Sequence, residues 1–425
     1  MDTRDLVKSF LERHNFYSFT SEKLLEDVLT DMKKGFEGGN SEQAMIRAGS
    51  ARTEKISDNE TAIVIDAGGT NFRSCLVTKT TDGIQISHFN KTSMPAMNKE
   101  LSRDEFFDEI ADNISRLKNL SDKISFCFSY AMEITRDGDG KILNLSKQIK
   151  APQVIGTFLG KELLQHLRNK GWKNVKTIKV LNDTKALLLS SFLDQDKEAF
   201  DLNLAFILGT GMNSALVKNQ ESVVTECGMF SKITMSDFDF AVDQSSSNPG
   251  KSIIEKMCSG AYLGSIAHEC LYLACKEGLF SDAFSSSFMK ISKLLTAYFD
   301  PIIDEKRRID SENDDNPLYN LFINSDSSDK EVLVYLIESI IDRSAKLTAI
   351  MICSGIIFSD KKNGGLPVRL ACNGSTFWKT PLLKNKVMFY LKNLLKQNEI
   401  KIKEIEIIQI EDDIIKGTFQ AAFIE

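Results

Sequence analysis

The sequence predicts an α/β protein made of two similar domains that face each other. Three observations support this fold class. The chain has 425 residues, which is too long for one ordinary hydrophobic core and suits two domains. Apolar, β-branched runs alternate with amphipathic helical runs, as they do in α/β proteins. A hairpin pattern with glycines at its tip occurs twice, over residues 62–77 and 203–217.

Each of these hairpins has an apolar run, a turn with two glycines, one or two small polar residues and a second apolar run. Glycine at a tip can adopt a positive φ and lets backbone N–H groups approach an anion. The turn alone would explain the glycines of either hairpin. The repetition of the hairpin favours the interpretation that the two tips bind the phosphate chain of a nucleotide from both sides. A strand follows each tip, whereas a helix follows in Walker A and dinucleotide motifs.

Two charged residues accompany the first tip. Asp66 directly precedes the glycine pair, where a carboxylate can recruit Mg²⁺ through water. Arg73 can supply a fixed positive charge at the same place. We therefore expect a phosphate and magnesium site here.

The remaining elements follow from periodicity and from turn residues. We expect one helical region over 4–35, a strand-rich region over 61–93, and no linker that separates two continuous halves. Further helices are predicted over 106–117, 158–168, from 248–252 through 276, and over 331–352, and further strands over 124–130, 177–181 and 368–372, before a closing α/β unit. Within residues 277–330, the runs 285–287, 310–315 and 325–329 are predicted to be exposed loops because they are rich in serine and acidic residues.

Composition excludes several classes of function. The net charge of −6 gives no electrostatic support for a nucleic-acid or anionic-membrane partner. The charged N-terminus does not resemble a signal peptide, and the longest nearly apolar stretch, 347–358, is too short to span a bilayer. We expect a cytoplasmic protein whose eight cysteines stay reduced, since no C-x-x-C pair occurs. Four histidines without metal-ligand spacing argue against zinc and Ser-His-Asp chemistry.

Carboxylates are therefore the candidate catalytic groups. Asp183 follows a buried strand, where open α/β sheets place their ligands, although an aspartate there is often only a helix cap. Glu226 lies in an apolar segment, and Glu255 is expected to share one helix face with Cys258, Ser259 and Tyr262. Together with Ser129, Asn182 and Asn213, these groups suit a polyhydroxylated ligand, because each hydroxyl both donates and accepts hydrogen bonds.

Seven motifs in order make the chain resemble the hexokinase family over most of its length, residues 277–330 excepted. They are Ile65-Asp-Ala-Gly-Gly-Thr-Asn-Phe-Arg73, Phe128-Ser-Tyr130, Leu181-Asn-Asp-Thr184, Leu208-Gly-Thr-Gly-Met-Asn213, Thr225-Glu-Cys-Gly228, Asn248-Pro-Gly250 with Glu255-Lys-Met257, and Cys372-Asn-Gly-Ser375. The resemblance implies two actin-like, ribonuclease H-like domains facing a central cleft. It places the small domain at 59–200, with 411–425 returning to it, and the large domain at 201–410, with 1–58 packed on it.

The resemblance also implies roles for individual residues. Asp183 resembles the base that deprotonates the 6-hydroxyl of a hexose. The positions that resemble sugar ligands are Ser129, Ser146, Lys147, Asn182, Asn213, Glu226 and Glu255. Those that resemble the nucleotide site are Asp66, Gly68, Gly69, Thr70, Asn71 and Arg73, then Gly209, Thr210 and Gly211, then Gly374 and Ser375. ATP and Mg²⁺, the latter at Asp66, are the implied phosphoryl donor and cofactor, and small-molecule sugar and nucleotide are the implied partners. The oligomeric state is not predicted.

The chain departs from the family pattern at several positions. The usual Phe-Ser-Phe-Pro ends in Tyr130-Ala131, Leu145 stands for a tryptophan, and Cys227 stands for an aromatic residue. Asn373 replaces an aspartate, and the segment 411–417 lacks the usual serine and one glycine. The resemblance favours phosphorylation of a sugar. A feeble, hexokinase-like sugar sensor and an ATPase without sugar specificity are the alternatives, although the latter leaves Glu226 and Glu255 unexplained.

Overall fold

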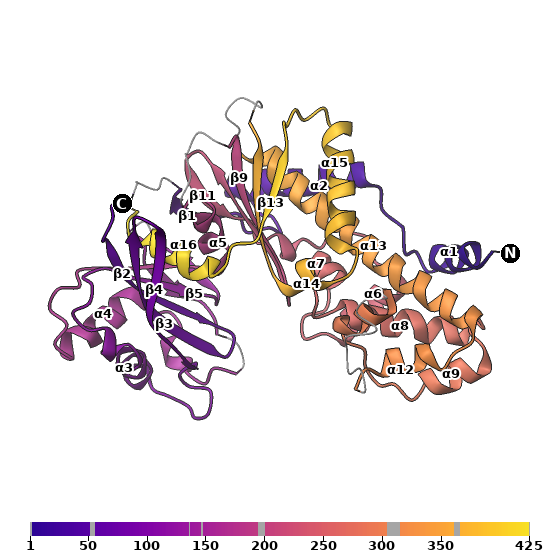
Figure 1. The fold of residues 1–425 in the computed structure, drawn as a ribbon, viewed down its shortest axis with the longest axis horizontal. Helices are drawn as coiled ribbons and strands as arrows, with labels where there is room; N and C mark the ends of the chain where they lie inside the picture. The colour runs from indigo at the N-terminus through magenta and orange to yellow at the C-terminus, as the bar shows by residue number, and fades with distance from the viewer. Residues whose placement is uncertain are drawn as a thin grey trace.

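The structure is a computed structural model, and it describes residues 2–51, 56–135, 137–145, 148–193, 200–303, 315–360 and 366–424. Two sheets form the centres of two lobes (Figure 1). We call the lobe of the five-stranded sheet the small lobe and that of the six-stranded sheet the large lobe. Each has its own hydrophobic core.

The sheet of the small lobe has the strand order β4-β3-β2-β5-β8. Strands β2, β3 and β4 form an antiparallel meander, whereas β5 and β8 run parallel to β2. Their bounds are β2 Thr61–Gly68, β3 Asn71–Thr80, β4 Gly83–Ser93, β5 Ile124–Phe128 and β8 Ile178–Leu181. A small antiparallel pair lies beside this sheet, formed by β6 Met132–Ile134 and β7 Gly140–Ile142.

The sheet of the large lobe has the order β1-β11-β10-β9-β12-β13. Strands β9, β10 and β11 form the antiparallel meander, and β12 and β13 run parallel to β9. The N-terminal strand β1 adds an antiparallel edge next to β11. The bounds are β1 Ile46–Ser50, β9 Leu202–Leu208, β10 Met212–Lys218, β11 Glu221–Val224, β12 Val368–Asn373 and β13 Ile405–Ile408.

Apart from β1, the two sheets have the same topology. In each, a glycine-tipped hairpin leads into a third antiparallel strand, and two later strands extend the sheet in parallel from the other side of the first strand. Such connections need helical crossovers, which agrees with the alternation of runs in the sequence. The predicted α/β fold with two similar domains is confirmed.

Helices cover the sheets. In the small lobe, α3 Arg103–Asn113 and α4 Leu159–Asn169 pack on the core of that lobe, with the short turns η1 Ser115–Leu117 and η2 Pro152–Val154. The helices and short turns of the large lobe are α1 Thr3–Arg13, α2 Ser21–Phe36, η3 Cys227–Met229, α6 Asp237–Ser245, α7 Ile253–Cys258, α8 Leu263–Lys276, α9 Asp282–Phe288, η4 Thr296–Phe299, α10 Asp300–Ile303, α12 Pro317–Ile323, α13 Ser327–Phe358, α14 Ser375–Lys379 and α15 Leu383–Gln397.

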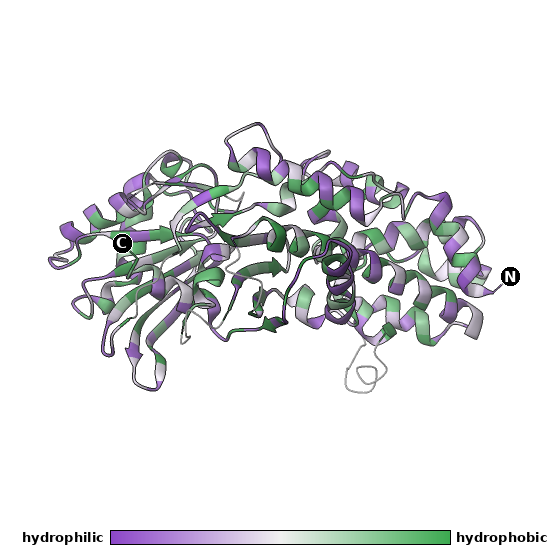
Figure 2. Ribbon diagram, turned by 90° about the horizontal axis from the view of Figure 1, so that it is seen from above, coloured by the Kyte–Doolittle hydropathy of each residue, from purple (hydrophilic) through white to green (hydrophobic). Residues whose placement is uncertain are grey.

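Figure 2 shows hydrophobic residues gathered along the strands, while the helices carry both hydrophobic and hydrophilic residues. No helix within the described ranges is long and apolar enough to cross a bilayer.

Two helices lie between the sheets. Helix α5, Asp183–Ser190, contacts strands of the large lobe and also packs on α16, Asp413–Ala421, which contacts β2 of the small lobe. The end of the chain thus lies beside strands formed near its beginning (Figure 1). The contact is tight at Gly417, where a β-carbon would lie 1.7 Å from the carbonyl oxygen of Ala186.

Two predicted helices are interrupted. The region 4–35 forms α1 and α2, because Asn15 has a left-handed φ of 56° and Thr20 caps a new helix. The run through residue 276 forms α7 and α8, because Gly260 lies between them with its N–H bonded to the carbonyl of Gly209 at 2.8 Å. The prediction that Glu255 shares one helix face with Ser259 and Tyr262 is therefore wrong.

The runs 285–287 and 325–329 are largely exposed, as predicted, but the prediction that they are loops is wrong. Ser285 and its neighbours belong to α9, where Phe284 and Phe288 are buried. Asp326 caps α13, and Asp329 is buried because it accepts hydrogen bonds from the N–H and hydroxyl of Ser281. Asp326 is a capping residue that begins a helix, whereas residues 285–287 lie within one. Most of the run 310–315 lies outside the described residues.

Candidate active site

Asp183 is the first residue of α5 and is separated from the end of β8 by Asn182 alone. Asn182 caps the helix, since its side-chain oxygen accepts a hydrogen bond from the N–H of Lys185 at 2.8 Å. The alternative that Asp183 is only the cap is therefore wrong. Its Oδ1 accepts hydrogen bonds from the N–H and hydroxyl of Thr184 at 2.7 and 3.1 Å. Burial raises the pKa of Asp183, and these hydrogen bonds oppose that rise.

Two cavities meet at Asp183 and Ser129, which line both of them. The first cavity has a volume of about 460 Å³ and the second about 560 Å³. The polar residues of the first are Ser129, Asn182, Asp183, Asn213 and Glu226, and its other walls are largely apolar. The second is lined by Asp66, Gly68, Gly69, Asn71, Arg73, Thr210, Asn373, Asp412 and Asp413, among others. Ligands in the two cavities would therefore approach the same carboxylate.

Glu226 faces the first cavity from the turn after β11. Its backbone has a left-handed φ of 53°, a conformation that non-glycine residues adopt mainly where the surrounding structure imposes it. Its Oε1 accepts a hydrogen bond of 2.8 Å from Nδ2 of Asn213 on β10. Burial raises the pKa of Glu226; the Asn213 bond lowers it, and the charge of Asp183 adds to the rise. The arrangement presents a polar, proton-accepting wall.

Glu255 lies behind this wall, on α7, and is not one of the residues that line the first cavity. Its Oε2 accepts a hydrogen bond from the N–H of Met212 at 2.9 Å. Gly211 and Gly228 make room for this carboxylate, since a β-carbon at Gly211 would lie 2.6 Å from Oε2. Burial raises the pKa of Glu255, and its charge also acts on Glu226.

The tip of the first hairpin lines the second cavity. Asp66 is partly buried there and pairs with Arg73, whose Nη1 lies 3.3 Å from Oδ2. Burial raises the pKa of Asp66 to about 6; Arg73 opposes this rise, and Asp183 and Asp413 add to it. At the tip, Gly69 has a φ of 58°, and the next residue, Thr70, accepts a hydrogen bond from the N–H of Met94 at 2.9 Å.

A third cavity, of about 300 Å³, adjoins the second through Thr210. It is lined from α14 by Ser375 and Thr376. Gly374 begins this segment with a φ of 111°, and a β-carbon there would lie 2.2 Å from the carbonyl oxygen of Leu208. The tip of the second hairpin is fixed to α14, because the hydroxyl of Thr376 donates to the carbonyl of Gly209 at 2.9 Å. The three cavities thus form a continuous series past Asp183 and Thr210.

The comparisons with known proteins agree with this geometry. One hexokinase model matches residues 6–193, and a second hexokinase model matches residues 203–424, more than half of the chain. The chain belongs to the hexokinase family.

Curated hexokinases match it at low identity. Hexokinase-1 of Rattus norvegicus is 24% identical over 441 residues, which cover 93% of this chain and 46% of the relative. The hexokinase of Emericella nidulans is 26% identical, with 92% of this chain and 84% of the relative covered. The chain thus spans about half the length of the mammalian hexokinase-1 relatives.

Solved hexokinases share the fold. The hexokinase of Schistosoma mansoni complexed with glucose has a TM-score of 0.74 at 21% identity and covers 99% of both chains. A second hexokinase crystal structure has a TM-score of 0.73 at 20% identity, covering 99% of this chain and 95% of that one. The predicted architecture, two actin-like domains, is therefore confirmed.

Most of the residues that the hexokinase resemblance selects lie along the three cavities or directly behind them. Gly209, Gly211, Gly374 and Glu255 support the walls rather than lining them. Ser146 and Lys147 lie outside the described residues.

Two acidic residues of the second cavity were missed from the sequence. Asp412 and Asp413 line it at the start of α16, and Nδ2 of Asn373 donates to Oδ2 of Asp413. Burial raises the pKa of Asp413, and the hydrogen bond from Asn373 opposes that rise. The sequence did contain a signal for these residues, because the chain departs from the hexokinase pattern both at 373, where the pattern has an aspartate, and near 413, where it has glycine and serine. The structure shows that these two departures are neighbours in space.

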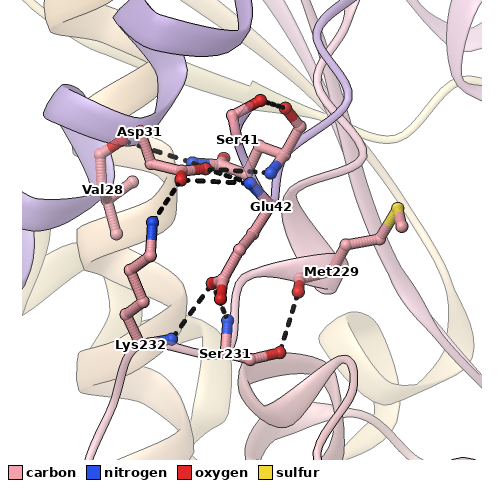
Figure 3. Close-up of polar contacts among 8 residues, drawn as sticks. Val28, Asp31, Ser41, Glu42, Met229, Ser231 and Lys232 are labelled. Atoms are coloured by element: carbon pink, nitrogen blue, oxygen red, sulfur yellow. Dashed lines mark hydrogen bonds and ion pairs between the residues drawn. The ribbon is translucent and has the colours of Figure 1, made fainter. Parts of the chain in front are cut away.

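A polar network supports the turn that carries Glu226 (Figure 3). Asp31 on α2 accepts hydrogen bonds from the N–H of Gln43 at 2.9 Å and from Nζ of Lys232 at 2.8 Å. Glu42 accepts from the N–H groups of Ser231 and Lys232 at 2.6 and 3.1 Å. The N-terminal segment therefore holds the chain that follows Glu226 and η3 in place.

Proposed function

We propose that this hexokinase-family protein transfers the γ-phosphoryl group of Mg-ATP to the 6-hydroxyl of a hexose such as glucose. The observation that carries the proposal is that Asp183 lines both the first and the second cavity. A sugar hydroxyl and a terminal phosphate would therefore meet at one carboxylate. Phosphoryl transfer depends mainly on such positioning and on charge neutralisation.

The first cavity suits the sugar. Its amide, hydroxyl and carboxylate groups can each accept or donate a hydrogen bond to a hydroxyl, and its apolar walls can face the ring carbons. Ser129 and Asn182 follow strands of the small lobe, while Asn213 and Glu226 belong to the large lobe. A bound sugar would thus join the two lobes. The glucose in the related Schistosoma mansoni structure supports this assignment.

The second and third cavities suit the nucleotide. Gly68 and Gly69 of the first tip and Thr210 of the second line the second cavity, where backbone N–H groups would meet the phosphates, and Arg73 adds a positive charge. Ser375 and its neighbours border the third cavity, where the adenosine would lie.

The donor set of the second cavity fits magnesium. Carboxylate oxygens of Asp66 and Asp413 face it, and Mg²⁺ prefers such oxygens together with phosphate and water. No three His, Cys, Asp or Glu side chains of the described residues form a metal site by themselves, which agrees with an ion held largely by the nucleotide. Asp66 would hold Mg²⁺ through water, and the ion would neutralise phosphate charge.

Asp183 would act as the general base. Its raised pKa strengthens its attraction for the hydroxyl proton. Water is a competing nucleophile, and closure of the lobes around the sugar would assemble the site only when a sugar is present. The reaction would take place in the cytoplasm, where the eight buried free cysteines would stay reduced.

A coupled assay tests the proposal. ADP release is measured with ATP and a panel of glucose, fructose, mannose and N-acetylglucosamine, and the phosphorylated position is identified by NMR. Sugar-dependent ADP release with a 6-phosphate product supports the proposal. Sugar-independent ADP release would indicate an ATPase, and sugar binding without ADP would indicate a sensor; either result rejects it.

A further inference from the structure

The sugar-side loop and the phosphate-side tip are joined by one side-chain hydrogen bond. The hydroxyl of Tyr130 donates to the carbonyl oxygen of Gly69 at 2.7 Å. Tyr130 lines the first cavity and not the second, whereas Gly69 lines the second and not the first. The bond therefore crosses the boundary between the two cavities.

This bond completes a series of contacts along the tip. The N–H of Ser129 donates to the carbonyl of Ala67 at 2.9 Å. Gly68 packs on Ser129, since a β-carbon at Gly68 would lie 3.0 Å from Cβ of that serine. Strand β2 ends at Gly68, so the sheet itself does not hold Gly69. Tyr130 thus extends the support one residue beyond the end of the strand.

The tyrosine is itself fixed and stays a donor. Its ring packs against Phe128, with the ring centroids 4.6 Å apart. Burial raises the pKa of Tyr130 to about 12, so its hydroxyl keeps its proton at neutral pH.

The hydrogen bond from Tyr130 to Gly69 also sets the direction of the next backbone N–H, that of Thr70. In a trans peptide, the carbonyl and the following N–H point in opposite directions. With the Gly69 carbonyl directed towards Tyr130, the N–H of Thr70 is directed away from it. Gly69 has a positive φ and no side chain, so its backbone would otherwise have much conformational freedom.

We propose that Tyr130 is a positioning residue, whose hydroxyl orients the Gly69–Thr70 peptide so that the phosphate-binding tip is aligned with the sugar pocket. This inference rests on the proposed function and deepens it. The hydroxyl would matter for the nucleotide, although the ring of the same residue lies in the sugar cavity. The hexokinase pattern has phenylalanine here, so this tether is an addition in this chain.

Tyr130→Phe tests the proposal because it removes the hydroxyl and keeps the ring. We expect kcat/KM for Mg-ATP to fall about 3- to 10-fold, as for the loss of one hydrogen bond, with KM for the sugar changed less than about 2-fold. Tyr390→Phe is the matched control: it removes a hydroxyl bonded to Asp342 at 2.7 Å between α13 and α15, and it should leave both values unchanged. Unchanged kinetics for Mg-ATP in Tyr130→Phe, or an equal loss for sugar and nucleotide, would overturn the proposal.

Hydrogen exchange provides a second readout that needs no turnover. We expect the amides of residues 69–72 to exchange faster in Tyr130→Phe than in the wild type, and Tyr390→Phe to leave them unchanged. If the wild type transfers no phosphoryl group, the proposed function fails while this measurement still tests the tether. Equal exchange in wild type and Tyr130→Phe would overturn it.

Discussion

Asn182 caps helix α5, and this leaves the carboxylate of Asp183, the next residue, free to line both cavities. The pair divides two tasks that a single aspartate would otherwise combine. Asn182 satisfies an unpaired N–H at the helix end, and Asp183 can take part in chemistry. Removing the Asp183 carboxylate should therefore change catalysis while leaving the Asn182 cap of α5 in place.

Asp183→Ala should lower turnover by about 100-fold or more while leaving sugar binding measurable, in line with the usual contribution of a general base. Steady-state ADP release and sugar titration by calorimetry measure the two effects. Asp122→Ala, at an exposed site in the small lobe, is the control and should behave as wild type. Near-normal turnover in Asp183→Ala would reject its role as the base.

Glu226→Gln should mainly weaken sugar binding. The partly buried carboxylate of Glu226 accepts a hydrogen bond from the amide of Asn213. A hydrogen bond from a sugar hydroxyl to such a charged acceptor contributes about 1.5–3 kcal/mol. KM for the sugar should therefore rise about 10- to 100-fold, with little change in KM for Mg-ATP. A change confined to the nucleotide side would contradict the assignment of the first cavity to the sugar.

Asp66→Asn should lower the transfer activity and raise the free energy of unfolding, the latter in a pH-dependent way. The pKa of Asp66 is raised in the folded state from 3.8 to about 6, so ionisation destabilises the fold as the pH rises from about 4 through about 6. The neutral variant avoids that cost, and its free energy of unfolding should exceed that of the wild type by up to about 3 kcal/mol above pH 7. Urea denaturation between pH 4.5 and 8 measures the difference.

The same variant should lose most of its transfer activity, since Asp66 lines the second cavity, where we propose that the phosphates bind. A stability difference that shrinks as the pH rises would show that the pKa of Asp66 is lowered rather than raised.

Gly417→Ala should destabilise the junction between the lobes. The new β-carbon would overlap the carbonyl of Ala186 in α5, and overpacking of this kind costs about 1–3 kcal/mol. Gly355→Ala in α13 is the control, because its β-carbon would meet only the side chain of Leu204 at 3.1 Å, which can adjust. Thermal unfolding should show a clearly lower Tm for the first variant alone. Equal Tm values would indicate that α16 and α5 separate easily.

The local chemistry of the chain is enough to predict the two hairpins, the alternation of strands and helices, and the position of Asp183 at the end of a buried strand. Glycine pairs between apolar runs and a carboxylate after a strand are signals that extend over only a few residues. Their repetition at 62–77 and 203–217 predicts the duplicated topology that the sheets show.

Contacts between distant residues decided the rest. Gly260 interrupts a predicted helix because it bonds to Gly209, and Asp413 lines the second cavity because α16 packs on α5. Likewise, the Tyr130 hydroxyl lies within hydrogen-bonding distance of Gly69 because β5 pairs with β2. Periodicity reports which face of an element is buried, but not which partner buries it. The sequence therefore determined the two domains and their candidate carboxylates, whereas the tertiary structure decided how charges and backbone groups from both lobes surround Asp183.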